Sequence, residues 1–320
     1  MPVEDPSAAQ VGRWTLPAAS GHHLPDGTLD EIAALFSDLR GLGQRQPPAI
    51  VLPTVLAQAH TLRALARTVT ATERPSVLML AARFAEYAGW CLQEAGDDAA
   101  ALLWTGRAAH LAAAGGDAQF AAYTDVRRAL VSLYRHDAVR TVELARRAES
   151  VADDHRVRGL AAQREAQGHA LGGDEDACRR ALDRAARHLA LAPPATPVVG
   201  TSTLSDPAGM VRGWCLYDLG RPVEAARILE HQLTRVAPAA IRTRVRFGAR
   251  LALAYAEAAE LEQTCELTNA LLGPAAHVDS ATVRSDFARL GYLLNRWRRE
   301  PAVRELLPKL RAVLHVSSIS

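Results

Sequence analysis

The sequence predicts an all-α protein built as a solenoid of helical hairpins. Residues 88–92 read AGWCL, and residues 212–216 repeat the pattern as RGWCL. In both copies a glycine follows seven residues after the motif glycine, and an alanine follows five residues after that. This spacing is typical of a helix, a tight turn and a second helix whose small residue allows close packing.

The composition supports the same fold class. Hydrophobic residues make up 49% of the 320-residue chain but aromatic residues only 5%, so alanine and leucine must form most of the core. Together with arginine and glutamate, these are good helix formers. A chain of this length exceeds the usual size of one compact core, whereas a solenoid grows with its number of repeats.

Charge, cysteine usage and hydropathy argue against several function classes. The 37 basic and 35 acidic residues nearly cancel, so we expect no direct DNA binding. The four cysteines are isolated, without a CxxC motif or Cys/His cluster, and we expect no metal site, no cofactor and no disulfide framework. No apolar run reaches membrane-spanning length and no signal-peptide pattern opens the sequence, which predicts a cytoplasmic protein without membrane contact.

Residues 1–27 are predicted to form a poorly structured N-terminal tail. Four prolines lie among small residues there, without a periodic apolar pattern. His22 and His23 are half of a metal site at most, and with no third ligand nearby we interpret them as part of a loop.

Three helices are predicted to precede the first complete hairpin turn. Thr28 and Glu31 have the spacing of a capping box, which predicts a helix that runs to Leu42. A second helix is expected over about 49–69, with a proline in its first turn, and a third over about 75–96.

From the third helix onward, one internal spacing recurs five times. The small residue of a first helix is followed twelve positions later by that of the second helix, with the turn seven positions after the first. The pairs are Gly89–Ala101, Ala129–Thr141, Glu165–Ala177, Gly213–Ala225 and Ala252–Thr264, with turns at Gly96, His136, Gly172, Gly220 and Ala259. Successive units begin 40, 36, 48 and 39 residues apart, and a proline-, serine- and glycine-rich loop over 192–207 explains the longest interval.

The last part of the chain is expected to close the solenoid with a cap. Beyond Gly273-Pro274, two more helices are predicted over about 280–298 and 301–314. The sequence therefore predicts a single α-solenoid domain over residues 28–316, with about five hairpins between N- and C-terminal capping helices.

Three segments carry a resemblance to a known family. Residues 80–113 (LAARFAEYAGWCLQEAGDDAAALLWTGRAAHLAA), 205–233 (SDPAGMVRGWCLYDLGRPVEAARILEHQL) and 283–306 resemble the tetratricopeptide-type sensor region of actinobacterial regulators that carry an N-terminal helix-turn-helix domain of the Xre class. The resemblance covers roughly residues 30–315 and implies a right-handed α-solenoid of tetratricopeptide-like hairpins. It also implies binding of a peptide, a small molecule or a protein partner, and leaves homodimer formation open. Because only about 27 residues precede the first predicted helix, we expect the sensor or scaffold half without the DNA-binding half.

The resemblance also indicates which residues would line the binding groove, since the first helix of each hairpin lines the concave face in such solenoids. Aromatic rings and a few arginines suit a groove that binds a peptide or small molecule. For Trp90 and Trp214, ordinary core packing between neighbouring helices is the competing and slightly favoured interpretation. The candidate groove residues are Arg83, Glu86, Trp90, Tyr123, Tyr134, His169, Met210, Trp214, Tyr217, Asp218 and Arg246.

Arg242, Arg246 and Arg250 share one face of a predicted helix. They could bind a carboxylate or phosphate, or they could form a solvated outer face. The run of glutamates that follows over 257–266 favours the solvated face.

Recognisable enzyme motifs are missing from the sequence, so no catalytic residue is assigned. Glu165 and His169 have the spacing of an acid–base couple on a helix, although a surface hydrogen bond is the favoured interpretation. Our first hypothesis is a non-enzymatic binding module that acts as a regulatory sensor or scaffold. The alternative is an unconventional biosynthetic enzyme that uses the groove as its active-site pocket, which a closed cavity with several perturbed pKa values would favour.

Overall fold

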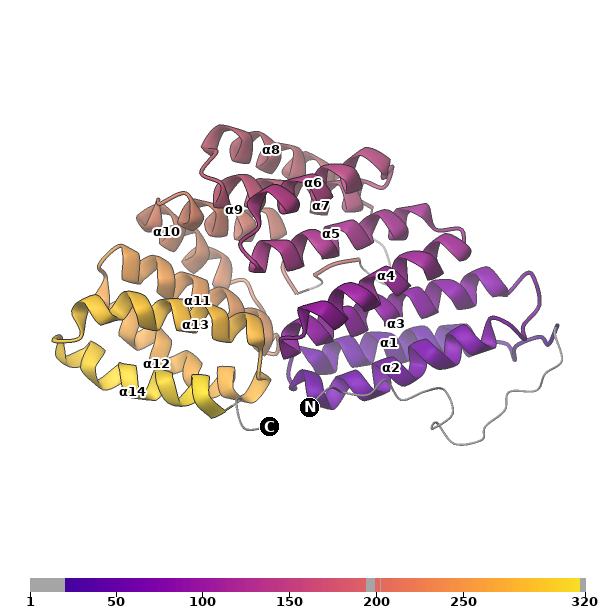
Figure 1. Cartoon of the computed structure of the whole chain (residues 1–320), viewed down its shortest axis with the longest axis horizontal. Helices are drawn as coiled ribbons and strands as arrows, with labels where there is room; N and C mark the ends of the chain where they lie inside the picture. Colours follow the sequence, from indigo (N-terminus) through magenta and orange to yellow (C-terminus); the bar gives the residue numbers. More distant parts are fainter. Residues whose placement is uncertain (1–20, 194–198, 202, 317–320) are drawn as a thin grey trace.

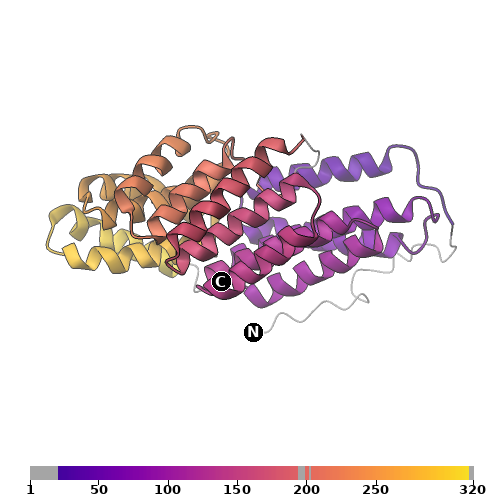
Figure 2. The same ribbon diagram turned by 90° about the horizontal axis from the view of Figure 1, so that it is seen from above.

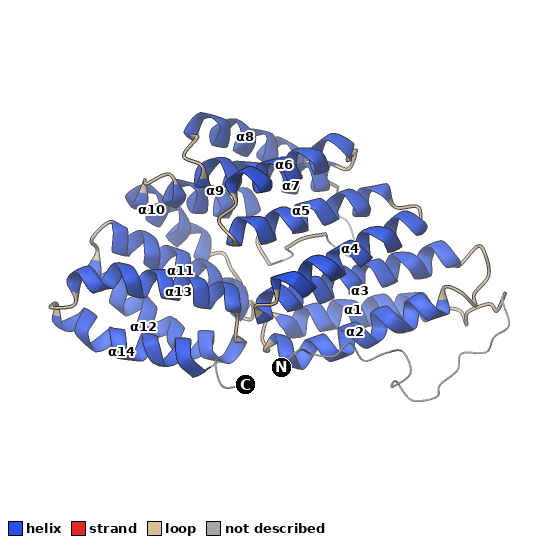
Figure 3. Ribbon diagram, in the orientation of Figure 1, coloured by secondary structure: helices blue, strands red, loops and turns tan. Residues whose placement is uncertain are grey.

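The computed structural model describes residues 21–193, 199–201 and 203–316. Over these residues the protein forms fourteen α-helices and one short 3-10 helix, arranged as a right-handed α-solenoid of tetratricopeptide-like hairpins (Figure 1). Figure 3 shows helices throughout the described part of the chain. Among the described residues, an isolated β-bridge pairs His22 with Val69.

The helices follow one another through short connections, apart from the long one before α9. Their bounds are α1 Thr28–Gly43, α2 Pro48–Leu65, α3 Arg74–Ala95, α4 Asp98–Ala114, α5 Ala118–Tyr134, α6 Ala138–Val151, α7 His155–Leu171, α8 Glu175–Leu191, α9 Pro207–Asp218, α10 Pro222–Leu233, α11 Ile241–Glu257, α12 Leu261–Val278, α13 Ala281–Leu294 and α14 Pro301–Val316. A 3-10 turn, Asn295–Trp297, extends α13.

Five hairpins make up the body of the solenoid: α3 with α4, α5 with α6, α7 with α8, α9 with α10 and α11 with α12. These are the pairs that the twelve-residue spacing predicts. In the first hairpin a Cβ atom at Gly89 would lie 3.0 Å from the carbonyl oxygen of Ala101 and 2.9 Å from the Thr105 hydroxyl. The small residue therefore allows α3 and α4 to approach as closely as the sequence pattern indicated.

The turn inside each hairpin uses a residue in the left-handed conformation, directly before the N-cap of the second helix. Glycine adopts this conformation without strain, and other residues do so at a cost. Four of the five predicted turn residues have a positive φ: Gly96, His136, Gly220 and Ala259.

The third hairpin differs from the predicted register by one residue. Its left-handed residue is Gly173, with φ of 79°, and not Gly172. The closely packed small residues are therefore Ala166 and Cys178, which are 0% and 1% exposed. Glu165, which the prediction placed at this position, instead pairs with arginines of α6 and α8.

Two predicted helix ends are also corrected. The N-cap of α1 is Gly27 in the left-handed conformation, so Thr28 begins the helix and does not cap it. Helix α12 does not stop at Gly273-Pro274 but continues to Val278. Pro274 removes a single backbone donor, and the burial of Ala275 and Val278 holds the last turn in place.

The chain before α1 lies against the connection between α2 and α3. The backbone N–H groups of Gly21 and His22 donate to the carbonyl oxygen of Thr68 at 2.8 and 3.0 Å. Of the predicted tail over residues 1–27, residues 1–20 lie outside the described residues. Among the helices described, none is long and apolar enough to cross a membrane.

The two ends of the solenoid meet across its concave side (Figure 1). Seen from above in Figure 2, the helices from the middle of the chain lie over this region. Helix α13 contacts α3. The connection between α1 and α2 lies at the start of α11, where the backbone N–H of Arg242 donates to the carbonyl oxygen of Gln44 at 2.9 Å. The superhelix is therefore closed around its inner face.

Candidate functional site

The concave face encloses a cavity of about 160 Å³. Its walls come from α1, from the first helix of each of the five hairpins and from the segment before α9. Arginine, glutamine and aromatic side chains predominate on these walls. The cavity therefore combines apolar rings with many hydrogen-bond donors.

The structure brings some of the predicted groove residues together and not others. Tyr134 lies beside the cavity, with the Arg246 guanidinium carbon 5.2 Å from its ring centroid and the Trp214 ring edge-on to it at 5.7 Å. Those that line the cavity are Glu86, Trp90, Tyr123, Trp214 and Arg246.

The remaining predicted residues lie away from the cavity. Met210 is 1% exposed in the core, and Arg83 lies over the ring of Phe120. Asp218 is 3.8 Å from Arg250, and Tyr217 lies under Arg289. None of these four side chains lines the cavity.

His169 belongs to a separate polar cluster between α6 and α8. Its Nε2 lies 3.3 Å from Arg146 and 3.4 Å from Glu165. The one-residue shift in the third hairpin explains this placement. The inner positions of α7 are Leu160, Gln163 and Gln167, and all three line the cavity.

Trp90 and Trp214 combine both roles that the sequence left open. Trp214 is 2% exposed, and the guanidinium carbon of Arg250 lies 3.8 Å from its ring centroid. Trp90 is partly exposed and stacks on Tyr87 with ring centroids 5.1 Å apart. Each ring packs on its neighbours and also presents atoms to the cavity.

The stripe of Arg242, Arg246 and Arg250 is not a solvated outer face. Arg242 and Arg250 are 3% and 6% exposed. Arg250 donates to Asp286 at 2.9 Å, and Arg246 reaches the cavity. Of the glutamates that suggested an outer face, Glu257 is exposed at the last turn of α11, and the others come after that helix.

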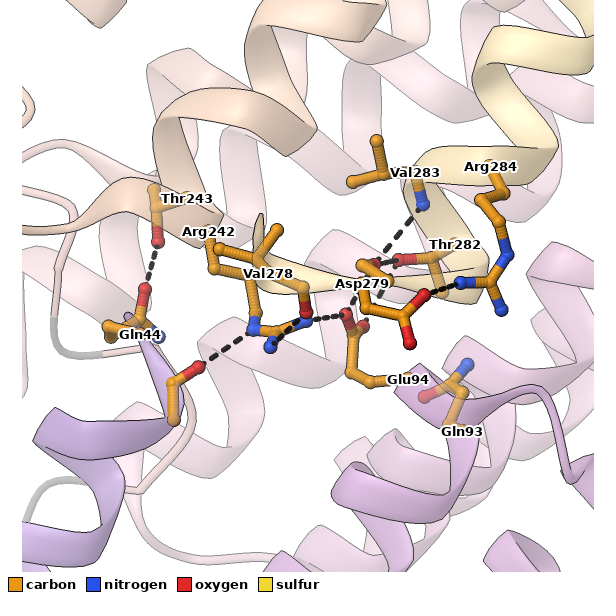
Figure 4. Close-up of polar contacts among 12 residues, drawn as sticks. Gln44, Gln93, Glu94, Arg242, Thr243, Val278, Asp279, Thr282, Val283 and Arg284 are labelled. Atoms are coloured by element: carbon orange, nitrogen blue, oxygen red, sulfur yellow. Dashed lines mark hydrogen bonds and ion pairs between the residues drawn. The ribbon is translucent and has the colours of Figure 1, made fainter. Parts of the chain in front are cut away.

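A buried ion pair joins the two ends of the solenoid (Figure 4). Arg242 Nη1 on α11 lies 3.0 Å from Glu94 Oε2 on α3. At the start of α13, the hydroxyl groups of Ser280 and Thr282 donate to the same carboxylate at 2.6 and 3.1 Å. Glu94 is 1% exposed, and its carboxylate accepts hydrogen bonds from these three partners. We call these four residues the closure cluster.

All three guanidinium nitrogens of Arg242 donate hydrogen bonds. Arg242 also donates to the carbonyl oxygens of Gly43 at 2.7 Å, Gln46 at 2.6 Å and Val278 at 2.9 Å. Burial raises the pKa of Glu94, but Arg242, Arg246 and the two hydroxyl groups outweigh it and hold that pKa below its usual value. The pair is therefore ionised and central to closure.

The segment before α9 forms one wall of the cavity and is held through its backbone. Arg156 on α7 donates to the carbonyl oxygens of Val199 at 2.7 Å and Thr201 at 2.9 Å. Arg40 on α1 donates to the carbonyl oxygen of Gly200 at 2.5 Å. Three successive peptide carbonyls are thus bound by arginine side chains on the inner face.

The fold and the enclosed inner cavity define a class, the tetratricopeptide-like α-solenoid. No protein-family model matches the sequence, and no curated protein matches it. Among solved structures, the chain is similar to the crystal structure of a Rap protein complexed with competence and sporulation factor. The TM-score is 0.54 at 11% identity, and the match covers 91% of this chain and 99% of that chain. At this level of identity the similarity concerns the fold.

Proposed function

We propose that the protein is a regulatory binding module that binds a peptide along its concave face, with part of the peptide inside the cavity. The observation that carries the proposal is the segment 199–201, whose carbonyl oxygens are bound by Arg40 and Arg156. A peptide ligand offers the same carbonyl groups. The rings of Trp90 and Trp214 supply apolar area for its side chains.

The similarity to a Rap protein supports the same proposal. That protein is complexed with competence and sporulation factor in its crystal structure. By analogy, we propose that the solenoid of this chain also binds a signalling ligand. The resemblance to Xre-class sensor regions adds a cytoplasmic sensor or scaffold role, through which the bound state would act on a protein partner rather than on DNA directly.

The chemistry of the cavity favours binding over the enzyme alternative. General acid–base catalysis works best when a group has a pKa near the working pH. Burial raises the pKa of Tyr123 further above its usual value, whereas the pKa of Glu94 lies below its usual value because its ion pair outweighs burial. Both shifts run away from neutrality. The described residues that line the cavity include no histidine, cysteine or aspartate.

Affinity selection from randomised short peptides tests the proposal. Selected peptides are then titrated calorimetrically against the wild type, Thr201→Trp and Thr234→Trp. Thr201 lines the cavity, so a tryptophan there should fill it and abolish binding. Thr234 is exposed after α10, and its tryptophan variant should bind as the wild type does. Selected peptides that bind Thr201→Trp unchanged, or a selection no better than empty resin, would contradict the proposal.

A further inference from the structure

Two arginines on the cavity wall have no carboxylate partner among the described residues. The ion pairs of the cavity join Arg127 to Glu86 and Arg242 to Glu94. Arg164 on α7 instead donates to the side-chain oxygen of Gln167. Arg246 on α11 lies over aromatic rings, and its buried Nε has no hydrogen-bond partner.

Two buried amides on α7 add further unpaired donors to the same wall. Gln163 and Gln167 are 1% and 0% exposed and both line the cavity. The Nε2 atom of each lacks a hydrogen-bond partner. Buried donors without partners are uncommon in folded proteins and indicate an acceptor that is bound there. All the unpaired groups of Gln163, Gln167 and Arg246 are N–H donors, so the missing acceptor is rich in oxygen.

The electrostatics of this wall agree with an anionic ligand. Burial and the nearby positive charges of Arg246 and Arg127 together lower the pKa of Arg164 to about 10. Of these three, Arg127 alone is paired with a carboxylate in the part of the chain that the structure describes. A negative group in the cavity would offset this excess of positive charge.

We propose that Arg164, Arg246 and the two buried amides form an oxyanion pocket that binds a carboxylate of the ligand. A planar carboxylate accepts two parallel hydrogen bonds from a guanidinium group. The cavity of about 160 Å³ accommodates this group and a few adjoining atoms, and is smaller than the roughly 300 Å³ at which sites for drug-sized ligands begin. Insofar as the carboxylate belongs to a peptide, as its C-terminus or an acidic side chain, this inference rests on the proposed function.

Small anions test the pocket without any peptide. Sodium acetate, sodium glutarate and sodium phosphate are titrated against the protein at constant ionic strength, with sodium chloride as the reference. The fluorescence of Trp90 and Trp214 reports binding, because both rings line the cavity. We expect a saturable change with both carboxylates, none with chloride and a weaker one with phosphate. Carboxylates that act no differently from chloride, or phosphate that binds more tightly than either carboxylate, would overturn the proposal.

Matched arginine variants locate the binding site. In Arg164→Met and Arg246→Met, the apparent Kd for acetate should rise about tenfold or more, as expected for loss of a charge-assisted hydrogen bond. Arg179 is exposed on α8, and Arg179→Met should bind acetate like the wild type. Replacing an unpaired buried charge by an apolar side chain of similar length should leave the melting temperature unchanged or raise it. Unchanged acetate binding in both cavity variants would contradict the assignment.

Peptide derivatives identify the source of the carboxylate. Each peptide recovered by selection is made with a free or an amidated C-terminus, and with its acidic residues kept or replaced by amides. Loss of binding in one series names the source. Full binding in both series would overturn the carboxylate pocket while peptide binding stands. Conversely, if no peptide is selected but acetate binding still depends on Arg164, the pocket stands and the peptide proposal fails.

Discussion

Trp90 and Trp214 occupy equivalent positions in two hairpins but have different surroundings. Trp214 is 2% exposed and packed between arginines and Tyr134, whereas Trp90 is partly exposed and stacks on one ring. Trp214→Ala should therefore cost about 3–5 kcal/mol of unfolding free energy, the usual loss for a buried large aromatic residue. Trp90→Ala should cost clearly less. Urea unfolding followed by circular dichroism measures both, and equal losses would contradict the difference in burial.

The closure cluster makes the stability of the fold depend on pH. The pKa of Glu94 is lower in the folded protein than its usual value, so its stabilisation is present above about 4.5 and is lost as the pH falls through the folded pKa. Glu94→Gln leaves Arg242 buried without its counter-charge, which should cost about 3–5 kcal/mol at neutral pH. The difference from the wild type should shrink in acid. Urea titrations across pH test this, and a difference that stays constant down to strongly acidic pH would contradict it.

Residue patterns predicted part of the cavity wall and missed the rest for a geometric reason. The inner positions of tetratricopeptide-like helices led to Glu86, Trp90, Tyr123, Trp214 and Arg246. In four hairpins the residue two positions before the small residue also lines the cavity, and the pattern does not include it: Tyr87, Arg127, Arg164 and Val211. By helix geometry this position lies about 20° from the position five after the small residue, so it is the edge of the same inner face. Closure of the superhelix adds residues such as Gln44 to the wall, and no local sequence signal reports that closure.

At the scale of elements, the helix N-caps indicate the register of each hairpin, which the spacing of small residues alone does not fix. Asp97, Asp137 and Asp174 each accept a hydrogen bond from a backbone N–H in the first turn of the following helix. In each case the left-handed turn residue directly precedes the aspartate. Asp174 therefore selects Gly173 over Gly172 as the turn residue. The register that Asp174 sets places Gln163 and Gln167 at inner positions of α7.

Two glycines inside helices should respond in opposite ways to alanine. A Cβ at Gly89 would lie 3.0 Å from a backbone oxygen of α4, which cannot move without separating the hairpin. Gly273 in α12 has no atom within 4 Å of the position that a Cβ would occupy. Gly89→Ala should lower the melting temperature, whereas Gly273→Ala should stabilise by roughly 0.5–1 kcal/mol through helix propensity. Thermal unfolding measures the melting temperature of both variants. A stabilised Gly89→Ala would contradict the close packing of α3 and α4.

At the scale of the whole molecule, the solenoid was predictable and its closure was not. Hairpins are local, so the recurring spacing of small residues and turns predicted the five helix pairs. Closure depends on the rotation accumulated over five hairpins, which brings Glu94 within 3.0 Å of Arg242, 148 positions away in the sequence. A local residue pattern does not determine this accumulated rotation. The same closure converts an open groove into a partly enclosed cavity.

Site-specific photo-crosslinking tests most directly the claim that this cavity is the binding site. Benzoylphenylalanine is placed at Leu204, which lines the cavity, or at Val139 on α6, which is 71% exposed. Each protein is irradiated with a peptide obtained by affinity selection, and adducts are located by mass spectrometry. We predict an adduct from position 204, competed by excess unlabelled peptide, and none from position 139. An adduct from position 139 with none from position 204 would contradict it, because the ligand would then bind outside the cavity.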